Sequence, residues 1–174
     1  YIFMAINQLS LLRTKRFLPL FLTQFFGAFN DNVYKNALVI MITYSLASAT
    51  QFNSQILITI AAGIFILPFF LFSALAGQIA DKFDKAKLIR YTKLAEITLM
   101  LLAGIGFYFQ SVFFLITLLF LIGTQATFFG PMKYSILPDQ LPENELIAGN
   151  ALLEAGTYFA ILTGTLLGGV LAVL

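Results

Sequence analysis

Long apolar stretches separated by short polar breaks constrain this chain more than any other feature. A helix needs about 20 apolar residues to cross the roughly 30 Å hydrocarbon core of a bilayer. Short breaks join antiparallel neighbours, so the sequence predicts an all-α integral membrane bundle of about five transmembrane helices. The five predicted spans cover approximately residues 17–46, 55–80, 88–109, 112–137 and 146–174.

Composition supports this class and excludes several chemistries. Of the 174 residues, 60% are hydrophobic and only 10% are charged, whereas soluble proteins carry about 25% charged residues. Cys and His are both absent from the sequence, which excludes disulfides and any thiol or imidazole chemistry in this chain. The net charge of +2 is too small to indicate a nucleic-acid partner. With no His and no clustered metal ligands in the sequence, we do not expect a membrane-embedded enzyme such as an acyltransferase, and we expect no metal and no cofactor.

The distribution of Lys and Arg predicts the orientation of the bundle, because cytoplasmic loops carry an excess of basic residues. Basic residues occur in the segment 1–16, in the break 81–87, and at Lys133 near the last connection, whereas the breaks 47–54 and 110–111 have none. We expect residues 1–16 to form a cytoplasmic, partly amphipathic lead-in and residues 17–174 to form the transmembrane domain.

The break after the second span carries the most specific motif. It reads GQIADKFDKAK over residues 77–87 and resembles the cytoplasmic signature of the major facilitator superfamily, G-x-x-x-D-[RK]-x-G-x-[RK]-[RK]. Asp84 and Ala86 stand where that signature has Gly and a basic residue. A Gly at the membrane edge allows close helix contact, although an ordinary basic turn would look similar. The matching residues, which the resemblance assigns to gating, are Gly77, Asp81, Lys82 and Lys87.

Four further segments narrow the resemblance. QFFGAFNDN (24–32), GPMKYSIL (130–137), NALLEA (150–155) and GTLLGG (164–169) resemble bacterial lysophospholipid transporters. The resemblance implies most of the N-terminal six-helix half of a twelve-helix transporter in the bacterial inner membrane.

The same resemblance implies a substrate, a mechanism and partners. The substrate is a lysophospholipid, chiefly the ethanolamine form, which crosses the membrane by alternating access between two six-helix halves. The implied partners are the lipid bilayer, the remaining transporter helices and, as in some relatives, fused acyltransferase and acyl-carrier-protein synthetase domains. A drug or siderophore exporter of the same superfamily is the alternative.

Polar residues in the first span are the main candidates for a substrate or coupling site. Asp31 lies about 21 Å along this helix, where a charge costs about 2.5–3.5 kcal/mol on insertion scales. Lys35, one turn further on, can pair with it. Gln24 shares that face, and Asn32 and Asn36 form a second polar row beside it. The stripe predicts either a ligand-binding face or a structural ion pair that locks the bundle.

Two other acidic residues lie inside predicted spans. Glu154 can reach Lys133 or Gln125 from the fourth span, and such a pair is equally compatible with head-group binding, gating or helix packing. For Glu96, the sequence favours a local pair with Lys93 near the membrane interface. Lys133, close to the cytoplasmic boundary, is also compatible with a lysine that extends its ammonium to the surface.

Small residues recur every four positions in the fifth span and predict a close helix contact. They are Gly156, Ala160, Gly164, Gly168 and Ala172. In the second span, Pro68 predicts a kink because proline cannot donate a backbone hydrogen bond.

Overall fold

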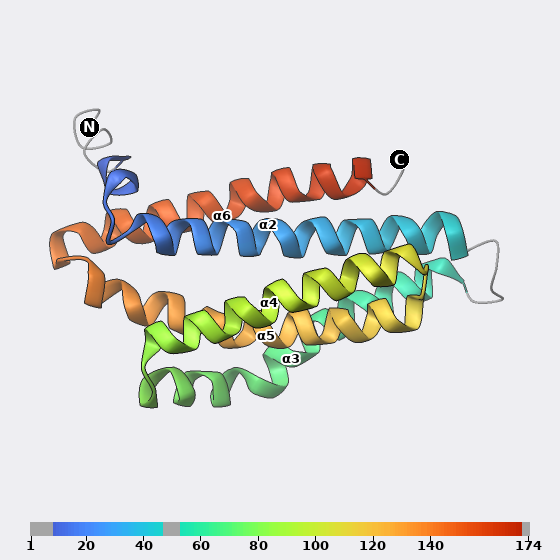
Figure 1. Cartoon of the computed structure of the whole chain (residues 1–174), viewed down its shortest axis with the longest axis horizontal. Coiled ribbons are helices and arrows are strands. Elements are labelled where there is room, and N and C mark those ends of the chain that lie inside the picture. Colours follow the sequence, from blue (N-terminus) through green and yellow to red (C-terminus); the bar gives the residue numbers. More distant parts are fainter. Residues whose placement is uncertain (1–8, 47–52, 172–174) are drawn as a thin grey trace.

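The computed structural model describes residues 9–46 and 53–171, and within these ranges five long α-helices form one bundle (Figure 1). The five predicted helices are confirmed, with bounds within a few residues of those expected. Of the predicted break 47–54, residues 47–52 fall outside the described residues, and so does Ala172. The elements are η1 (Ser10–Arg13), α2 (Leu18–Met41), η2 (Ile42–Leu46), α3 (Ser54–Lys82), α4 (Lys85–Tyr108), α5 (Val112–Gln140) and α6 (Glu143–Leu171).

Helix starts follow local sequence signals. The side chain of Asn53 accepts a hydrogen bond from the backbone N–H of Gln55 at 2.9 Å and caps α3. Asp84 accepts from the backbone N–H of Lys87 at 2.9 Å and caps α4 in the same way. Such caps satisfy N–H groups that the first helical turn leaves without partners. Asp84, which departs from the superfamily signature, therefore has a structural role at the start of α4.

The helices pack as two groups. Helix α2 lies along α6, and α5 packs against both α3 and α4 (Figure 1). Helix α3 bends near its middle (Figure 1), and Pro68 lies inside this helix. The bend agrees with the predicted kink, because Pro68 cannot donate to the preceding turn.

The contact between α2 and α6 depends on the small residues of α6. A Cβ atom added at Gly164 would lie 2.5 Å from the carbonyl oxygen of Phe29, and one added at Gly168 would lie 2.5 Å from that of Val33. Both distances are too short for a side chain, so the two backbones meet directly. The predicted close contact along this strip is confirmed for its described members.

One end of the bundle carries the basic segments. Arg16 pairs with Glu145 at 2.6 Å, and Lys85 pairs with Asp139 at 2.8 Å. These pairs join the residues before α2 to the start of α6, and the start of α4 to the end of α5. The basic segments therefore share one end, as an antiparallel bundle requires, and the cytoplasmic location of that end remains a prediction.

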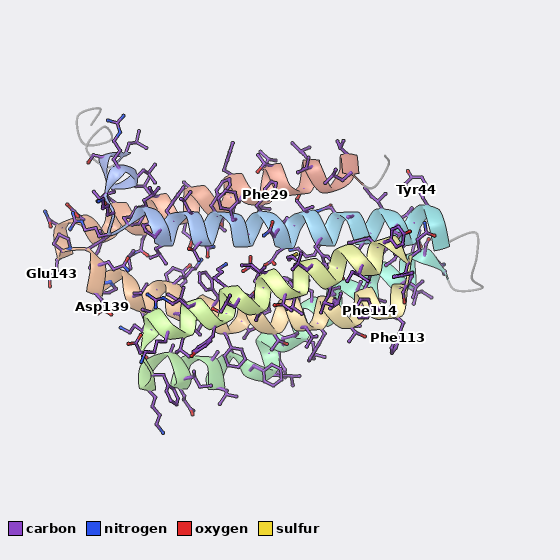
Figure 2. The ribbon with its side chains drawn as sticks, in the orientation of Figure 1. Phe29, Tyr44, Phe113, Phe114, Asp139 and Glu143 are labelled. Carbon is purple, nitrogen blue, oxygen red and sulfur yellow. The ribbon has the colours of Figure 1, made fainter. Side chains whose placement is uncertain are left out.

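The opposite end is aromatic. Figure 2 shows Asp139 and Glu143 at the basic end and Tyr44 and Phe113 at the far end. Tyr44 is 76% exposed and Phe113 is 85% exposed, which suits side chains at a membrane boundary.

Three of the described helices, α3, α5 and α6, are long and apolar enough to cross a membrane by length and composition. Helices α2 and α4 are also long, but they carry more polar side chains. Together with α5, these two helices supply almost all of the candidate site.

Candidate functional site

A polar cavity lies between α2, α4 and α5, with a volume of about 180 Å³. Two acidic and two basic side chains line it together with two glutamines. Only two of these six, Asp31 and Gln24, belong to the polar stripe predicted on the first span. The six polar residues are Gln24, Asp31, Lys93, Glu96, Gln125 and Lys133.

Glu96 forms the best-connected part of this cavity. Its Oε2 atom lies 2.6 Å from the Lys93 ammonium and accepts a hydrogen bond from the Gln125 side chain at 3.1 Å. The predicted local pair is confirmed, and its position near the membrane interface stays a prediction; Glu96 is only 6% exposed, so the pair is buried among the helices. Its side chain points inward to α5, so the carboxylate lies between three helices.

Gly27 on α2 makes room for this ion pair. A Cβ atom added at Gly27 would lie 2.5 Å from Lys93 Nζ and 3.4 Å from Glu96 Oε2. The Lys93 ammonium also lies 4.3 Å from the centre of the Phe129 ring on α5. The missing side chain at Gly27 therefore lets the charges of α4 approach α2.

Asp31 lines the same cavity but does not pair with Lys35. None of the four ion pairs among the described residues includes either of them, so the predicted pairing is wrong. Four residues exceed a full helical turn by about 40°, and the two side chains diverge toward different neighbours. The Lys35 ammonium lies 4.4 Å from the centre of the Phe65 ring on α3. The Oδ1 atom of Asp31 is buried and accepts no hydrogen bond from the described residues.

The remaining amides of the stripe bind α2 to α6 or to its own backbone. Gln24 donates to the Thr157 hydroxyl at 2.8 Å, and Asn36 donates to the Thr165 hydroxyl at 3.3 Å. Asn32 donates to the carbonyl oxygen of Ala28 at 2.7 Å. The second polar row therefore faces α6, where it supports helix packing.

Glu154 was predicted to reach either Lys133 or Gln125, and in the structure it pairs with Lys133. The Lys133 ammonium lies 3.4 Å from Glu154 Oε1, and the Tyr134 hydroxyl donates to the same oxygen at 2.7 Å. Gln125 is instead bonded to Glu96. Lys133 is only 8% exposed, so the interpretation that its ammonium extends to the surface is wrong.

The residues of the predicted gating motif lie apart from the cavity. A Cβ atom added at Gly77 would meet nothing within 4 Å, so the expected close helix contact is not made among the described helices. Asp81, Lys82 and Lys87 are exposed. The structure thus places the motif on a free surface at the basic end of the bundle.

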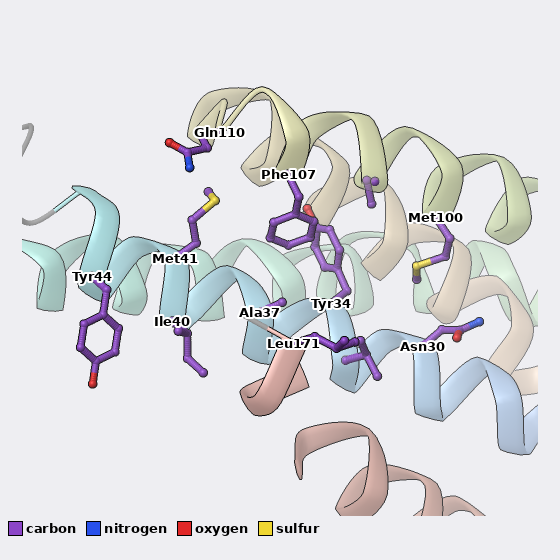
Figure 3. A pocket seen from close by; sticks show the side chains of 13 residues that line it. Asn30, Tyr34, Ala37, Ile40, Met41, Tyr44, Met100, Phe107, Gln110 and Leu171 are labelled. Carbon is purple, nitrogen blue, oxygen red and sulfur yellow. The ribbon is translucent and has the colours of Figure 1, made fainter. Parts of the chain in front are cut away.

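A larger and mainly apolar cavity of about 590 Å³ opens between α2, α4 and the end of α6 (Figure 3). Tyr34 of α2 faces Phe107 of α4, with ring centres 5.5 Å apart. The Tyr34 hydroxyl donates to the carbonyl oxygen of Leu115. The residues that line this cavity are mostly apolar. For that reason no pattern of polar residues in the sequence indicated it.

The sequence analysis did not predict several residues of the polar cavity as site residues. The spacing of Lys93 and Glu96, three residues apart on one helix, is a detectable signal of a pair. Gly27 carries no such signal, because its importance depends on Lys93 and Glu96 in another helix. The same holds outside this cavity for Tyr134, which donates to Glu154 of α6.

A sequence model of a family described as transmembrane secretion effector matches residues 6–174. The chain belongs to this family of the major facilitator superfamily, and it is part of a multi-pass membrane protein of a transporter class.

Individual relatives add a narrower similarity. The chain is 33% identical over 154 residues to the lysophospholipid transporter LplT of Pectobacterium carotovorum, a match that covers 87% of this chain and 34% of the relative. It is 32% identical over 162 residues to LplT of Salmonella arizonae, covering 91% of this chain and 37% of the relative. The chain thus spans about a third of the length of the curated relatives it matches. No solved structure matches it.

Proposed function

We propose that the full-length protein is a secondary transporter that moves lysophospholipid across the bacterial inner membrane by alternating access. The observation that carries the proposal is the polar cavity, which holds charges of both signs inside a helix bundle. Ionisable groups at such depth are costly and usually mark substrate or ion pathways. A phosphoethanolamine head group is a ligand of matching chemistry, because it carries one positive and one negative charge.

Asp31 is the group in the cavity best suited to receive the ammonium of the substrate. Its buried Oδ1 atom has no partner among the described residues, whereas Glu96 already binds Lys93 and Gln125. A charge-assisted hydrogen bond from an ammonium would satisfy this oxygen. Asp31 therefore contacts the head group, and the Lys93–Glu96 pair maintains the polarity of the cavity.

The Lys133–Glu154 pair provides a second contact on the substrate path. The side chain of Glu154 is 39% exposed, so a ligand that enters from the basic end can reach it. The motif residues, of which Asp81, Lys82 and Lys87 are exposed and Gly77 is partly buried, contact the remaining transporter helices. In this proposal the basic end of the bundle, including the N-terminus, is cytoplasmic.

Uptake of labelled lysophosphatidylethanolamine into vesicles that contain the full-length protein tests the proposal. We expect uptake above that of protein-free vesicles, and a large loss in Asp31→Asn at equal protein level. Absence of uptake by the wild-type protein would refute lysophospholipid transport.

Export of drugs or siderophores is the second candidate. The description of the matched family as a secretion effector favours this direction of transport. The same vesicles decide between the two functions: movement of a drug or siderophore, without movement of the lysophospholipid, would support the exporter.

A further inference from the structure

Lys35 occupies an apolar pocket of about 270 Å³ between α2 and α3. Buried Leu38, Ala61 and Leu119 form its inner wall, and Phe65 lies beneath the ammonium. The pocket contains one cation and otherwise hydrocarbon, so it differs from the polar cavity beside it.

Lys35 forms no ion pair within 4 Å among the described residues, although the Asp31 carboxylate on the same helix attracts its ammonium from further away. Lys93 and Lys133, the other lysines deep in the helices, each lie within ion-pair distance of a glutamate. In direct contact, Lys35 has only the face of an aromatic ring, which is weaker compensation than a carboxylate. A lysine at this depth is costly, so the site calls for an anion that is not part of the described helices.

We infer that Lys35 binds the phosphate of the transported lysophospholipid, with the adjoining part of its single acyl chain in the apolar pocket. The inference rests on the proposed function and deepens it. It assigns the two charges of one head group to two residues of α2, the ammonium to Asp31 and the phosphate to Lys35.

The spacing of these residues supports the assignment. Asp31 and Lys35 are four residues apart, so their backbone positions are separated by about 6 Å along α2. Their side chains diverge, and each remains without an ion-pair partner among the described residues. In phosphoethanolamine, a two-carbon linker joins the ammonium to the phosphate, so the assignment requires this short head group to reach from the polar cavity at Asp31 to the apolar pocket at Lys35.

The phosphate contact, rather than the apolar wall, would discriminate between ligands. An acyl chain that leaves the bilayer exchanges one hydrocarbon environment for another, so its burial adds little free energy. The charge-assisted bond to Lys35 has no equivalent in the lipid core. Selectivity at this site should therefore depend on the anionic group of the ligand.

The KM for lysophosphatidylethanolamine uptake by the full-length protein tests the inference. Loss of one charge-assisted hydrogen bond predicts a KM about 10- to 100-fold higher in Lys35→Gln, with Lys35→Arg close to wild type. The exposed Lys15, which belongs to none of the ion pairs among the described residues, supplies the charge-matched control Lys15→Gln. An unchanged KM in Lys35→Gln would overturn the inference. Lys35→Met keeps the apolar stem and replaces Lys35→Gln if the latter does not fold.

A binding measurement separates this inference from the proposed function. We expect lysophosphatidylglycerol to raise the melting temperature of the purified wild-type protein more than a monoacylglycerol of equal chain length, and this difference to vanish in Lys35→Gln. If that holds while wild-type vesicles take up no lysophospholipid, the transport proposal fails and the anion site stands. If the difference persists in Lys35→Gln, the site assignment is wrong.

A resident anionic phospholipid is the competing ligand, because its head group carries a net negative charge that zwitterionic bilayer lipids lack. Uptake is therefore measured in vesicles with and without phosphatidylglycerol. A KM defect of Lys35→Gln in both supports the substrate phosphate, whereas a defect that appears only with phosphatidylglycerol assigns Lys35 to bilayer lipid and overturns the inference.

Discussion

The contact between α2 and α6 allows a sharp test, because two adjacent glycines of α6 have different surroundings. A Cβ atom added at Gly168 would lie 2.5 Å from the carbonyl oxygen and 2.9 Å from the Cα atom of Val33. A Cβ atom added at Gly169 would have its nearest neighbour, Ile40 Cδ1, at 3.8 Å. Gly168→Ala and Gly169→Ala thus introduce the same methyl group into the same helix, at a crowded and an open position.

The cost at Gly168 follows from what the methyl group would meet. Both atoms belong to the backbone of α2, so no rotamer change relieves the clash and the helices must separate by roughly 1 Å, with an overpacking cost of about 1–3 kcal/mol. Gly169→Ala should be neutral or slightly stabilising, because Ala is the better helix former.

Thermal unfolding of the full-length protein in detergent measures the difference. We expect the melting temperature of Gly168→Ala to fall several degrees below that of Gly169→Ala, with Gly164→Ala behaving like Gly168→Ala. Equal melting temperatures for the two neighbours would refute a backbone contact at this position.

Three further predictions concern the site and the topology. Asp31→Asn should abolish lysophospholipid uptake without loss of folded protein. Neutralising Lys35 as well should not restore uptake, because the two residues form no ion pair. Recovered uptake in the double variant would show that the two residues are a structural ion pair that locks the bundle. Gly27→Ala should reduce uptake and lower the melting temperature, because the added methyl group displaces the Lys93 ammonium from its buried ion pair with Glu96. Gly63→Ala, where the added atom meets nothing within 4 Å, is the control, and equal melting temperatures in the two variants would contradict this contact. A cysteine introduced at Asp84 should react with a membrane-impermeant reagent only after the cells are opened, and labelling of intact cells would reverse the predicted orientation.

The sequence was sufficient to predict the helices and the small strip on α6. Both depend on information along one helix: the length of an apolar stretch, and a spacing of four residues that places Gly156, Gly164 and Gly168 on one face. The kink in α3 was predictable for the same reason, because Pro68 acts on its own helix.

The composition of the polar cavity was less predictable, because it depends on how helices face one another. The periodicity of α2 places Asp31 and Lys35 near the same face, but it does not show that Lys35 lies over Phe65 of α3. Similarly, the pair of Lys93 with Glu96 was visible in the spacing, whereas its burial against Gly27 was not.

Most charged side chains inside the bundle form an ion pair with a neighbouring helix or turn, and Asp31 and Lys35 are the two exceptions among the described residues. Lys93 pairs with Glu96 and Lys133 pairs with Glu154, so each of these four charges is compensated within the protein. Asp31 and Lys35 carry opposite charges on one helix and attract each other, yet they line separate cavities and form no ion pair.

A ligand with a single charge would pair with only one of these two residues, and the free-energy cost of burying the other charge would remain. A zwitterionic head group satisfies both, because it brings each residue a partner of opposite sign. For this reason the geometry of α2 favours an amphiphile with two opposite charges close together over a simple cation or a simple anion.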